Sequence, residues 1–174
     1  MHLPLLAALW TRQRQGDLLR LKWFSYDGTY IRLTQSKSIR RRKSGKRSTP
    51  VRVLIPVGAP LKAVLDAARM GKSAQDNVLL NSHGKPWTSD GFRTSWGKAC
   101  AAAGIVGLTF HDLRGTAVTR LAVAGCTEPE IVTITGHTLK DVRSILDANY
   151  LHRDPALAER AIRKLEARAK REPI

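Results

Sequence analysis

The residues best suited to chemistry lie in the second half of the chain, in the order His111-Asp-Leu-Arg114, Gly136-His137 and Tyr150. Arginine presents a planar fork of donors that matches two phosphate oxygens at once. Histidine donates a hydrogen bond or transfers a proton near neutral pH, and tyrosine can act as a covalent nucleophile. Together, these residue types can support phosphoryl transfer that needs no metal ion.

The spacing of His111 and Arg114 places both side chains on one face of a helix. Thr109 is expected to be the N-cap of that helix, with Asp112 as its capping-box partner. Free backbone N–H groups and the helix dipole at this position attract anions, so the pair is suited to bind a phosphate. A solvated arginine beside a histidine at the edge of the core is the alternative interpretation.

His137 and Tyr150 can each be interpreted in two ways. His137 follows a glycine that is expected to end a helix, so its side chain either faces a cleft or has a structural role at the start of the next helix. Tyr150 continues a helical stripe with Val142 and Leu146, which is also the pattern of a core aromatic residue.

Two basic residues in the first part of the chain complete the set of candidates. Arg14 lies at a junction between two expected helices, close to Asp17, whose carboxylate can orient a neighbouring arginine. Lys37 lies where an expected strand meets a basic loop, and its ammonium group could reach a leaving oxygen. Ordinary surface basic residues are the alternative for both.

The composition favours a nucleic-acid partner. The chain has 174 residues, 43% of them hydrophobic, which is enough for one domain with its own core. Its 30 Lys and Arg against 14 Asp and Glu give a net charge of +16, which indicates a polyanion, and nucleic acid before a membrane. With no secretory signal, Cys100 and Cys126 are expected to be reduced core thiols of a cytoplasmic protein. No apolar run reaches transmembrane length.

The hydrophobic pattern predicts a mostly α fold with a small antiparallel β-sheet, an α+β domain. The expected helices span residues 3–10, 15–22, 59–70, 89–103, 110–124, 128–135, 138–149 and 155–171, and the expected strands span 29–34, 51–55 and a short 78–80. Seven basic residues between Lys37 and Arg47 form an exposed connection between the first two strands. Its candidate DNA-binding residues are Arg40, Arg41, Arg42, Lys43, Lys46 and Arg47.

The order of these candidates closely resembles the tyrosine recombinase, or phage integrase, family. The segment from Arg14 to Trp23 is similar to the first arginine motif of that family, and His111-Asp-Leu-Arg114 is similar to its second box. The resemblance extends from about Leu5 to Tyr150, nearly all of the family's catalytic domain. His-x-x-Arg alone is a weak pattern, but five elements in this order form a strong one.

The resemblance implies site-specific cleavage and rejoining of double-stranded DNA through a 3′-phosphotyrosyl intermediate, without cofactor or metal. Tyr150 would attack the scissile phosphate, and Lys37 would protonate the leaving 5′ oxygen. The two arginines would neutralise the nonbridging oxygens, and the two histidines would donate hydrogen bonds and assist proton transfer. The implied catalytic set is Arg14, Lys37, His111, Arg114, His137 and Tyr150.

The chain also departs from the family pattern. Arg12 stands where a glycine is usual, and Tyr150 follows His137 by 13 positions, a longer spacing than is common. Residues 1–174 are expected to form a single catalytic domain that lacks the N-terminal DNA-clamping domain and the opening helix. A DNA-binding remnant without turnover, or a basic structural nucleic-acid binder, are therefore the competing interpretations.

The last expected helix, 155–171, is amphipathic. Its apolar stripe comprises Leu157, Ala161, Ile162, Leu165 and Ala169, with most of its basic residues elsewhere. The resemblance implies that this segment docks on a neighbouring protomer and supports self-association on DNA. Docking on the chain's own domain is the alternative.

Overall fold

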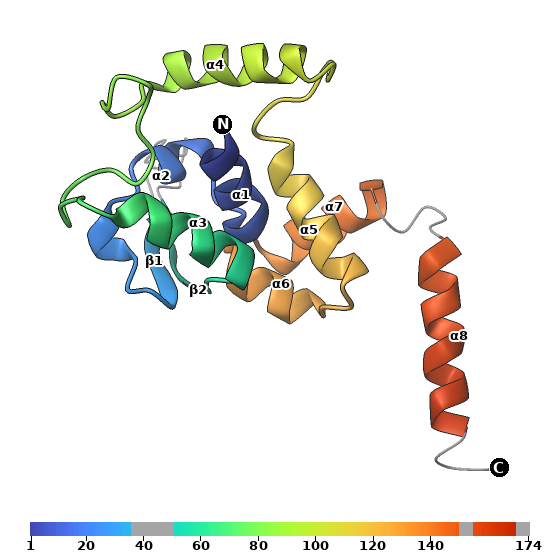
Figure 1. Ribbon diagram of the computed structural model, residues 1–174. Coiled ribbons are helices and arrows are strands. Elements are labelled where there is room, and N and C mark those ends of the chain that lie inside the picture. Colours follow the sequence, from blue (N-terminus) through green and yellow to red (C-terminus); the bar gives the residue numbers. More distant parts are fainter. Residues whose placement is uncertain (36–50, 150–154, 170–174) are drawn as a thin grey trace, which may run out of the picture.

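A computed structural model describes residues 1–35, 51–149 and 155–169. The described residues contain eight α-helices and one two-stranded antiparallel sheet (Figure 1), which confirms the predicted α+β class. The elements are α1 (His2–Thr11), α2 (Gln15–Leu19), the 3₁₀ turn η1 (Trp23–Ser25), β1 (Tyr30–Gln35), β2 (Val51–Pro56), α3 (Ala59–Arg69), α4 (Ser89–Ala102), α5 (Leu113–Val123), α6 (Glu128–Thr135), α7 (Leu139–Asn149) and α8 (Pro155–Ala169).

Several predicted functional residues lie outside the described residues. They are Lys37, Arg40, Arg41, Arg42, Lys43, Lys46 and Arg47 in the segment between β1 and β2, and Tyr150 after α7.

Strands β1 and β2 pair in the antiparallel register that the sequence predicts, with Ile31 opposite Ile55 and Leu33 opposite Val53. These four side chains are buried, while the residues between them along each strand are exposed, as the alternation of a one-sided sheet requires. The third predicted strand, 78–80, is wrong. Val78 donates its N–H to the Leu21 carbonyl at 2.8 Å, and only isolated bridges flank it among the described residues, because no continuous partner strand lies alongside there.

Helix α1 lies at the centre of the molecule, packed against α3 on one side and α5 on the other (Figure 1). The main core surrounds it and includes buried residues of α2, the sheet, α3 and α4. Helix α2 is shorter than predicted and ends at Leu19, yet Leu18, Leu19 and Leu21 all point inward as expected. A second core joins α5, α6 and α7 through Val118, Ala122, Ile131, Val142 and Leu146.

The two cysteines are both free, and they differ in environment. Cys100 is buried in α4, as predicted, whereas Cys126 is only half-buried in the turn before α6. None of the described helices combines the length and the apolar character that crossing a lipid bilayer requires.

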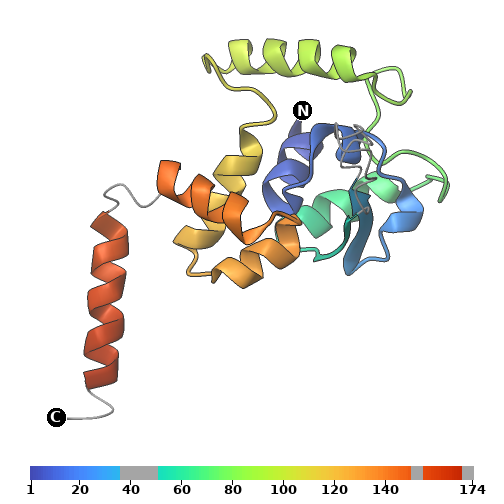
Figure 2. The ribbon, with the colours of Figure 1, turned by 180° about the vertical axis from the view of Figure 1, so that it is seen from behind.

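Helix α8 projects away from the rest of the molecule, as both views show (Figures 1 and 2). Ile162 and Leu165 on its apolar stripe are 54% and 64% exposed, and Ala161 is exposed as well. The described part of the stripe is therefore not covered by the chain's own domain, in contrast to the docking in cis considered above.

Arg12 closes α1 in the left-handed conformation, with φ 59° and ψ 24°. It is the one described residue other than glycine with a positive φ, and it stands where the family that the sequence resembles usually has glycine. Its side chain is only 4% exposed, and Nε and Nη1 have no partner among the described residues. Burial, together with the nearby charge of Arg120, lowers the pKa of Arg12 to about 10.

Comparing Arg12→Gly with Arg12→Ala isolates the backbone cost at this cap. Both changes remove the guanidinium, but only glycine has no Cβ atom to clash with the following carbonyl oxygen at a positive φ. The glycine variant is expected to be more stable than the alanine variant by about 1 kcal/mol. Urea unfolding followed by circular dichroism measures the difference. Equal midpoints at equal slope would contradict a strained cap.

Candidate active site

Arg14 is positioned by the sharp junction between α1 and α2. The chain leaves α1 at Arg12, becomes extended at Arg14, and re-enters a helix at once, with the Arg14 carbonyl accepting N–H groups from Asp17 and Leu18 at 2.9 and 3.0 Å. The buried Asp17 carboxylate accepts a hydrogen bond from Arg20 at 3.0 Å. Asp17 thus orients a neighbouring arginine, as expected, and it does so for Arg20.

The helix that was predicted to contain both His111 and Arg114 begins later than the sequence predicts. Helix α5 starts at Leu113 with Asp112 as its N-cap, so the predicted Thr109 cap is wrong. Residues 110–112 form a turn instead, in which the Asp112 N–H donates to the Thr109 carbonyl at 3.2 Å. One interaction of the predicted capping box is still present, because the Asp112 carboxylate accepts hydrogen bonds from the hydroxyl and N–H of Thr109 at 2.7 and 2.8 Å. These bonds lower the pKa of Asp112.

An aromatic cluster fixes the approach to this turn. Phe110 lies edge-on between Phe92 and Trp96 of α4, with ring centroids 4.8 and 5.0 Å away. The Trp96 indole also donates to the Leu108 carbonyl at 3.2 Å. Because Phe110 is buried, the next residue, His111, is presented at the surface at a defined point, and Arg114 follows in the first turn of α5.

His137 is positioned by the end of α6. The predicted capping box between Thr127 and Glu130 is present and fixes the start of that helix. Gly136 closes the helix with φ 65°, as predicted, and donates its N–H to the Val132 carbonyl at 2.8 Å. The chain reverses there, and the His137 N–H donates to the Thr135 hydroxyl at 3.2 Å.

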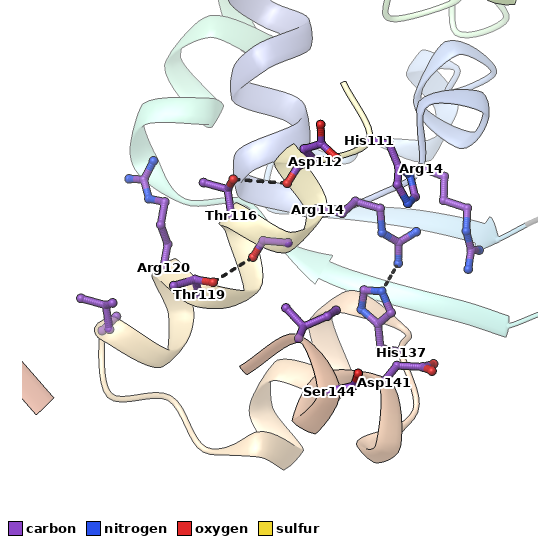
Figure 3. Close-up of a pocket in the computed structure, with 14 residues that line it drawn as sticks. Arg14, His111, Asp112, Arg114, Thr116, Thr119, Arg120, His137, Asp141 and Ser144 are labelled. Carbon is purple, nitrogen blue, oxygen red and sulfur yellow. Dashed lines mark hydrogen bonds between the residues drawn. The ribbon is translucent and has the colours of Figure 1, made fainter. Parts of the chain in front are cut away.

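These three segments bring Arg14, His111, Arg114 and His137 together around one pocket of about 1090 Å³ (Figure 3). Arg114 Nη2 lies 2.7 Å from His137 Nε2. Sequence reasoning predicted that these four residues converge together with Tyr150, which lies outside the described residues, but it missed the rest of the lining. These lining residues could have been found from helical spacing, because residues on the face of α5 that holds Arg114 recur every three or four positions, and the same holds along α7. The other lining residues include Asp112, Thr116, Thr119, Arg120, Asp141 and Ser144.

The hydrogen-bond pattern assigns the protonation state of His137. A guanidinium only donates, so Nε2 of His137 accepts from Arg114 and Nδ1 carries the proton. His137 Nδ1, Arg114 Nη1 and Arg14 Nη1 are all buried, and none has a hydrogen-bond partner among the described residues. Buried donors are nearly always paired in native proteins. Three unpaired donors on residues that line one pocket therefore indicate a site for an acceptor-rich ligand.

The electrostatics of the pocket favour an anion. Burial, followed by the charge of Arg14, lowers the pKa of Arg114 to about 10, so the Arg114 guanidinium stays cationic at neutral pH. Burial, followed by the charge of Arg114, lowers the pKa of His137 to about 4, which keeps the imidazole neutral. The pocket thus presents two positive charges and neutral donors, a combination suited to a phosphate.

The pKa of His137 makes a testable prediction for stability. The unfolded chain takes up this proton near pH 6.5, whereas the folded chain does so only near pH 4. The free energy of unfolding should therefore fall as the pH is lowered through that window. In His137→Gln, whose amide oxygen can still accept from Arg114, this part of the decrease should disappear. Urea unfolding at a series of pH values gives the two slopes, and identical slopes would contradict the prediction.

The sequence profile of the phage integrase family matches residues 3–156. The chain belongs to the phage integrase family. Among curated proteins, it is 29% identical over 133 residues to the shufflon-specific DNA recombinase of Escherichia coli. The aligned residues cover 75% of this chain and 30% of that protein.

Solved structures of integrases and recombinases have the same fold. The Tn1549 transposon integrase in complex with transposon right end DNA superposes with a TM-score of 0.70 at 19% identity, over 95% of this chain and 58% of that chain. A lambda integrase dimer bound to a COC′ core site gives 0.67 at 23% identity, over 87% and 43%. XerA recombinase gives 0.66 at 19% identity, over 91% and 55%. This integrase-family chain therefore spans 30% to 58% of the lengths of these relatives.

Proposed function

We propose that this phage integrase family chain is a catalytic domain that cleaves and rejoins DNA at specific sites through a 3′-phosphotyrosyl intermediate. One observation carries the proposal: buried, unpaired donors of Arg14, Arg114 and His137 belong to residues around a single basic pocket. A phosphodiester supplies the acceptor oxygens and the negative charge that such a pocket lacks.

In the proposed reaction, the Tyr150 hydroxyl oxygen bonds to the scissile phosphorus as the bond to the 5′ oxygen breaks. Arg14 and Arg114 neutralise the charge that builds on the nonbridging oxygens, which is the largest contribution expected in such a site. His111 and His137 donate hydrogen bonds and assist the transfer of the Tyr150 hydroxyl proton to solvent, and Lys37 delivers a proton to the leaving 5′ oxygen. Rejoining reverses these steps, because the phosphotyrosyl ester retains the energy of the broken bond.

Double-stranded DNA is the proposed partner. The net charge of +16 favours a polyanion, and two of the structural relatives are described in complexes with DNA. We assign the DNA-contacting role to Arg40, Arg41, Arg42, Lys43, Lys46 and Arg47 of the basic segment between β1 and β2.

A nicked suicide duplex tests the proposed chemistry, because loss of the short cleaved strand prevents rejoining and traps the covalent adduct. The wild-type chain should give a slower protein band on a denaturing gel, and Tyr150→Phe should give none. DNA binding without an adduct would indicate a remnant that lost turnover. Binding that is also insensitive to Arg114→Ala would indicate a structural nucleic-acid binder.

The exposed stripe of α8 supports a proposed role in self-association on DNA. Burying Ile162 and Leu165 against a neighbouring protomer would gain about 25 cal/mol for each Å² of apolar area. A chain truncated after residue 154 is expected to remain folded and to lose assembly on DNA, as measured by the mass of the protein–DNA complex in solution. Equal numbers of protomers per DNA for the full and truncated chains would refute this role. Arg163→Ala, which removes an exposed charge of α8 and leaves the stripe intact, serves as the control.

A further inference from the structure

Two glutamines near residues of the pocket are completely buried. Gln35, the last residue of β1, is 0% exposed, and Gln13, at the junction of α1 and α2, is 1% exposed. Glutamine is mostly found on protein surfaces, and a buried carboxamide is costly unless its polar atoms are paired. Neither residue lines the pocket, so a direct contact with DNA does not account for their presence.

The two side chains bond to each other and to three backbone carbonyls. Gln35 Nε2 donates to Gln13 Oε1 at 2.7 Å and to the Thr135 carbonyl at 2.8 Å. Gln13 Nε2 donates to the Thr11 carbonyl at 2.7 Å and to the Ile134 carbonyl at 3.3 Å. Carbonyls only accept, so both amides can be oriented in just one way. We call these two side chains and their acceptors the glutamine network.

The glutamine network joins segments that are far apart in sequence and that each lead into the pocket. Gln13 immediately precedes Arg14, and the Thr135 carbonyl lies two residues before His137. Gln35 connects them from β1, spanning 22 residues to Gln13 and 100 residues to Thr135. The backbones that carry one arginine and one histidine of the pocket are therefore held by a single set of hydrogen bonds.

Gly136 fits closely against this network. A Cβ atom at Gly136 would lie 2.6 Å from Gln35 Nε2 and 2.8 Å from the carbon and oxygen of the same amide. The residue also has a φ of 65°, which disfavours any side chain. The Gln35 amide thus occupies the space behind the turn that directs His137 toward the pocket, and it limits how that turn can move.

We propose that Gln13 and Gln35 are positioning residues for DNA cleavage, whose network fixes Arg14 and His137 relative to each other so that both reach one phosphate. The proposal rests on the proposed function of the pocket. Gln35 also lies two residues before Lys37 in sequence, so the same network anchors the strand that leads to the proposed proton donor.

Gln35→Glu is the sharpest variant, because it keeps the shape of the side chain and turns the donor into an acceptor that faces two other acceptors. Gln35→Met removes both hydrogen bonds at similar volume and covers the case in which the buried carboxylate prevents folding. Gln15→Glu is the matched control. Gln15 lies two residues from Gln13 on the other side of Arg14 and bonds to Ser89 at the surface.

The measurement separates chemistry from binding. Single-turnover adduct formation on saturating suicide duplex should slow by about a hundredfold in the Gln35 variants, while DNA affinity and the folded fraction stay near the wild-type values. Gln15→Glu should match the wild type in all three. A merely structural role would instead reduce the folded fraction and leave the rate of the folded molecules unchanged, which would overturn the proposal.

A second measurement does not depend on cleavage. Inorganic sulfate binding, followed by calorimetry, should weaken at least tenfold in the Gln35 variants and be unchanged in Gln15→Glu. If the wild-type chain forms no adduct, the proposed function fails, while the sulfate comparison still decides whether the network positions the pocket. Unchanged sulfate affinity together with unchanged cleavage rates would refute the positioning role.

Discussion

Arg114→Met is expected to slow phosphotyrosyl adduct formation by about a thousandfold while leaving the folded protein at least as stable. Removing one charge-stabilising donor from a preorganised site costs about 10²–10³ in rate, and a guanidinium that opposes charge on a transferring phosphoryl group can be worth more. Arg114 is 4% exposed, and Nη1 has no hydrogen-bond partner among the described residues. An apolar side chain of similar length removes a desolvated charge from the interior.

Two measurements on the same protein test this separation of activity from stability. Single-turnover cleavage of the suicide duplex gives the rate, and urea unfolding gives the stability. Arg93→Met is the control, because Arg93 is an exposed arginine on α4 that pairs with Asp90 at 3.2 Å. A variant that loses activity and stability together would show that Arg114 mainly supports the fold. Retained cleavage would remove Arg114 from the proposed mechanism.

Neutralising the basic segment should have the second largest effect. Changing Arg40, Arg41, Arg42, Lys43, Lys46 and Arg47 to glutamine is expected to weaken DNA binding by roughly a thousandfold at low salt. The slope of log affinity against log salt should also become shallower by about 0.9 for each DNA phosphate that the segment no longer neutralises. Like charges this dense in sequence repel each other until a polyanion neutralises them.

Fluorescence anisotropy with labelled duplex across a series of salt concentrations gives both quantities. Lys62→Gln is the control, because Lys62 already pairs with Asp66 at 2.7 Å on α3 and should contribute little to DNA binding. A slope that stays the same in the neutralised variant would rule out phosphate binding by this segment.

The sequence predicted correctly those elements whose ends or register are fixed by their own residues. The Thr127–Glu130 capping box and Gly136 fix both ends of α6, and the alternation in β1 and β2 fixes their register. The Thr109 cap failed because Thr109 and Asp112 can both cap a helix, and the burial of Phe110 selects the tighter turn. The prediction of a strand at Val78 was wrong because a strand needs a neighbouring strand to pair with, and the tertiary fold places none there among the described residues.

The sequence indicated which residues form the candidate site, but not the hydrogen bonds that hold them in place. Arg14, His111, Arg114 and His137 could be selected because their types and order indicate phosphate chemistry, and the pocket brings them together. The glutamine network could not, because two isolated glutamines usually indicate surface positions. The positive φ of Arg12 could not be predicted from the arginine itself, and only the glycine that is usual at this position in the family pointed to it.

The glutamine network also defines what can be exchanged between members of the family. A chimaera whose first strand carried another residue in place of Gln35 would put that residue against the Gln13 amide and the backbone of Gly136. Gln35 supplies the donor, Gln13 the acceptor and Gly136 the space for the amide, and the three lie in separate segments. A crossover that replaces only one of these segments would disrupt their fit. Segment exchange in this protein is therefore expected to succeed only when positions 13, 35 and 136 are transferred together.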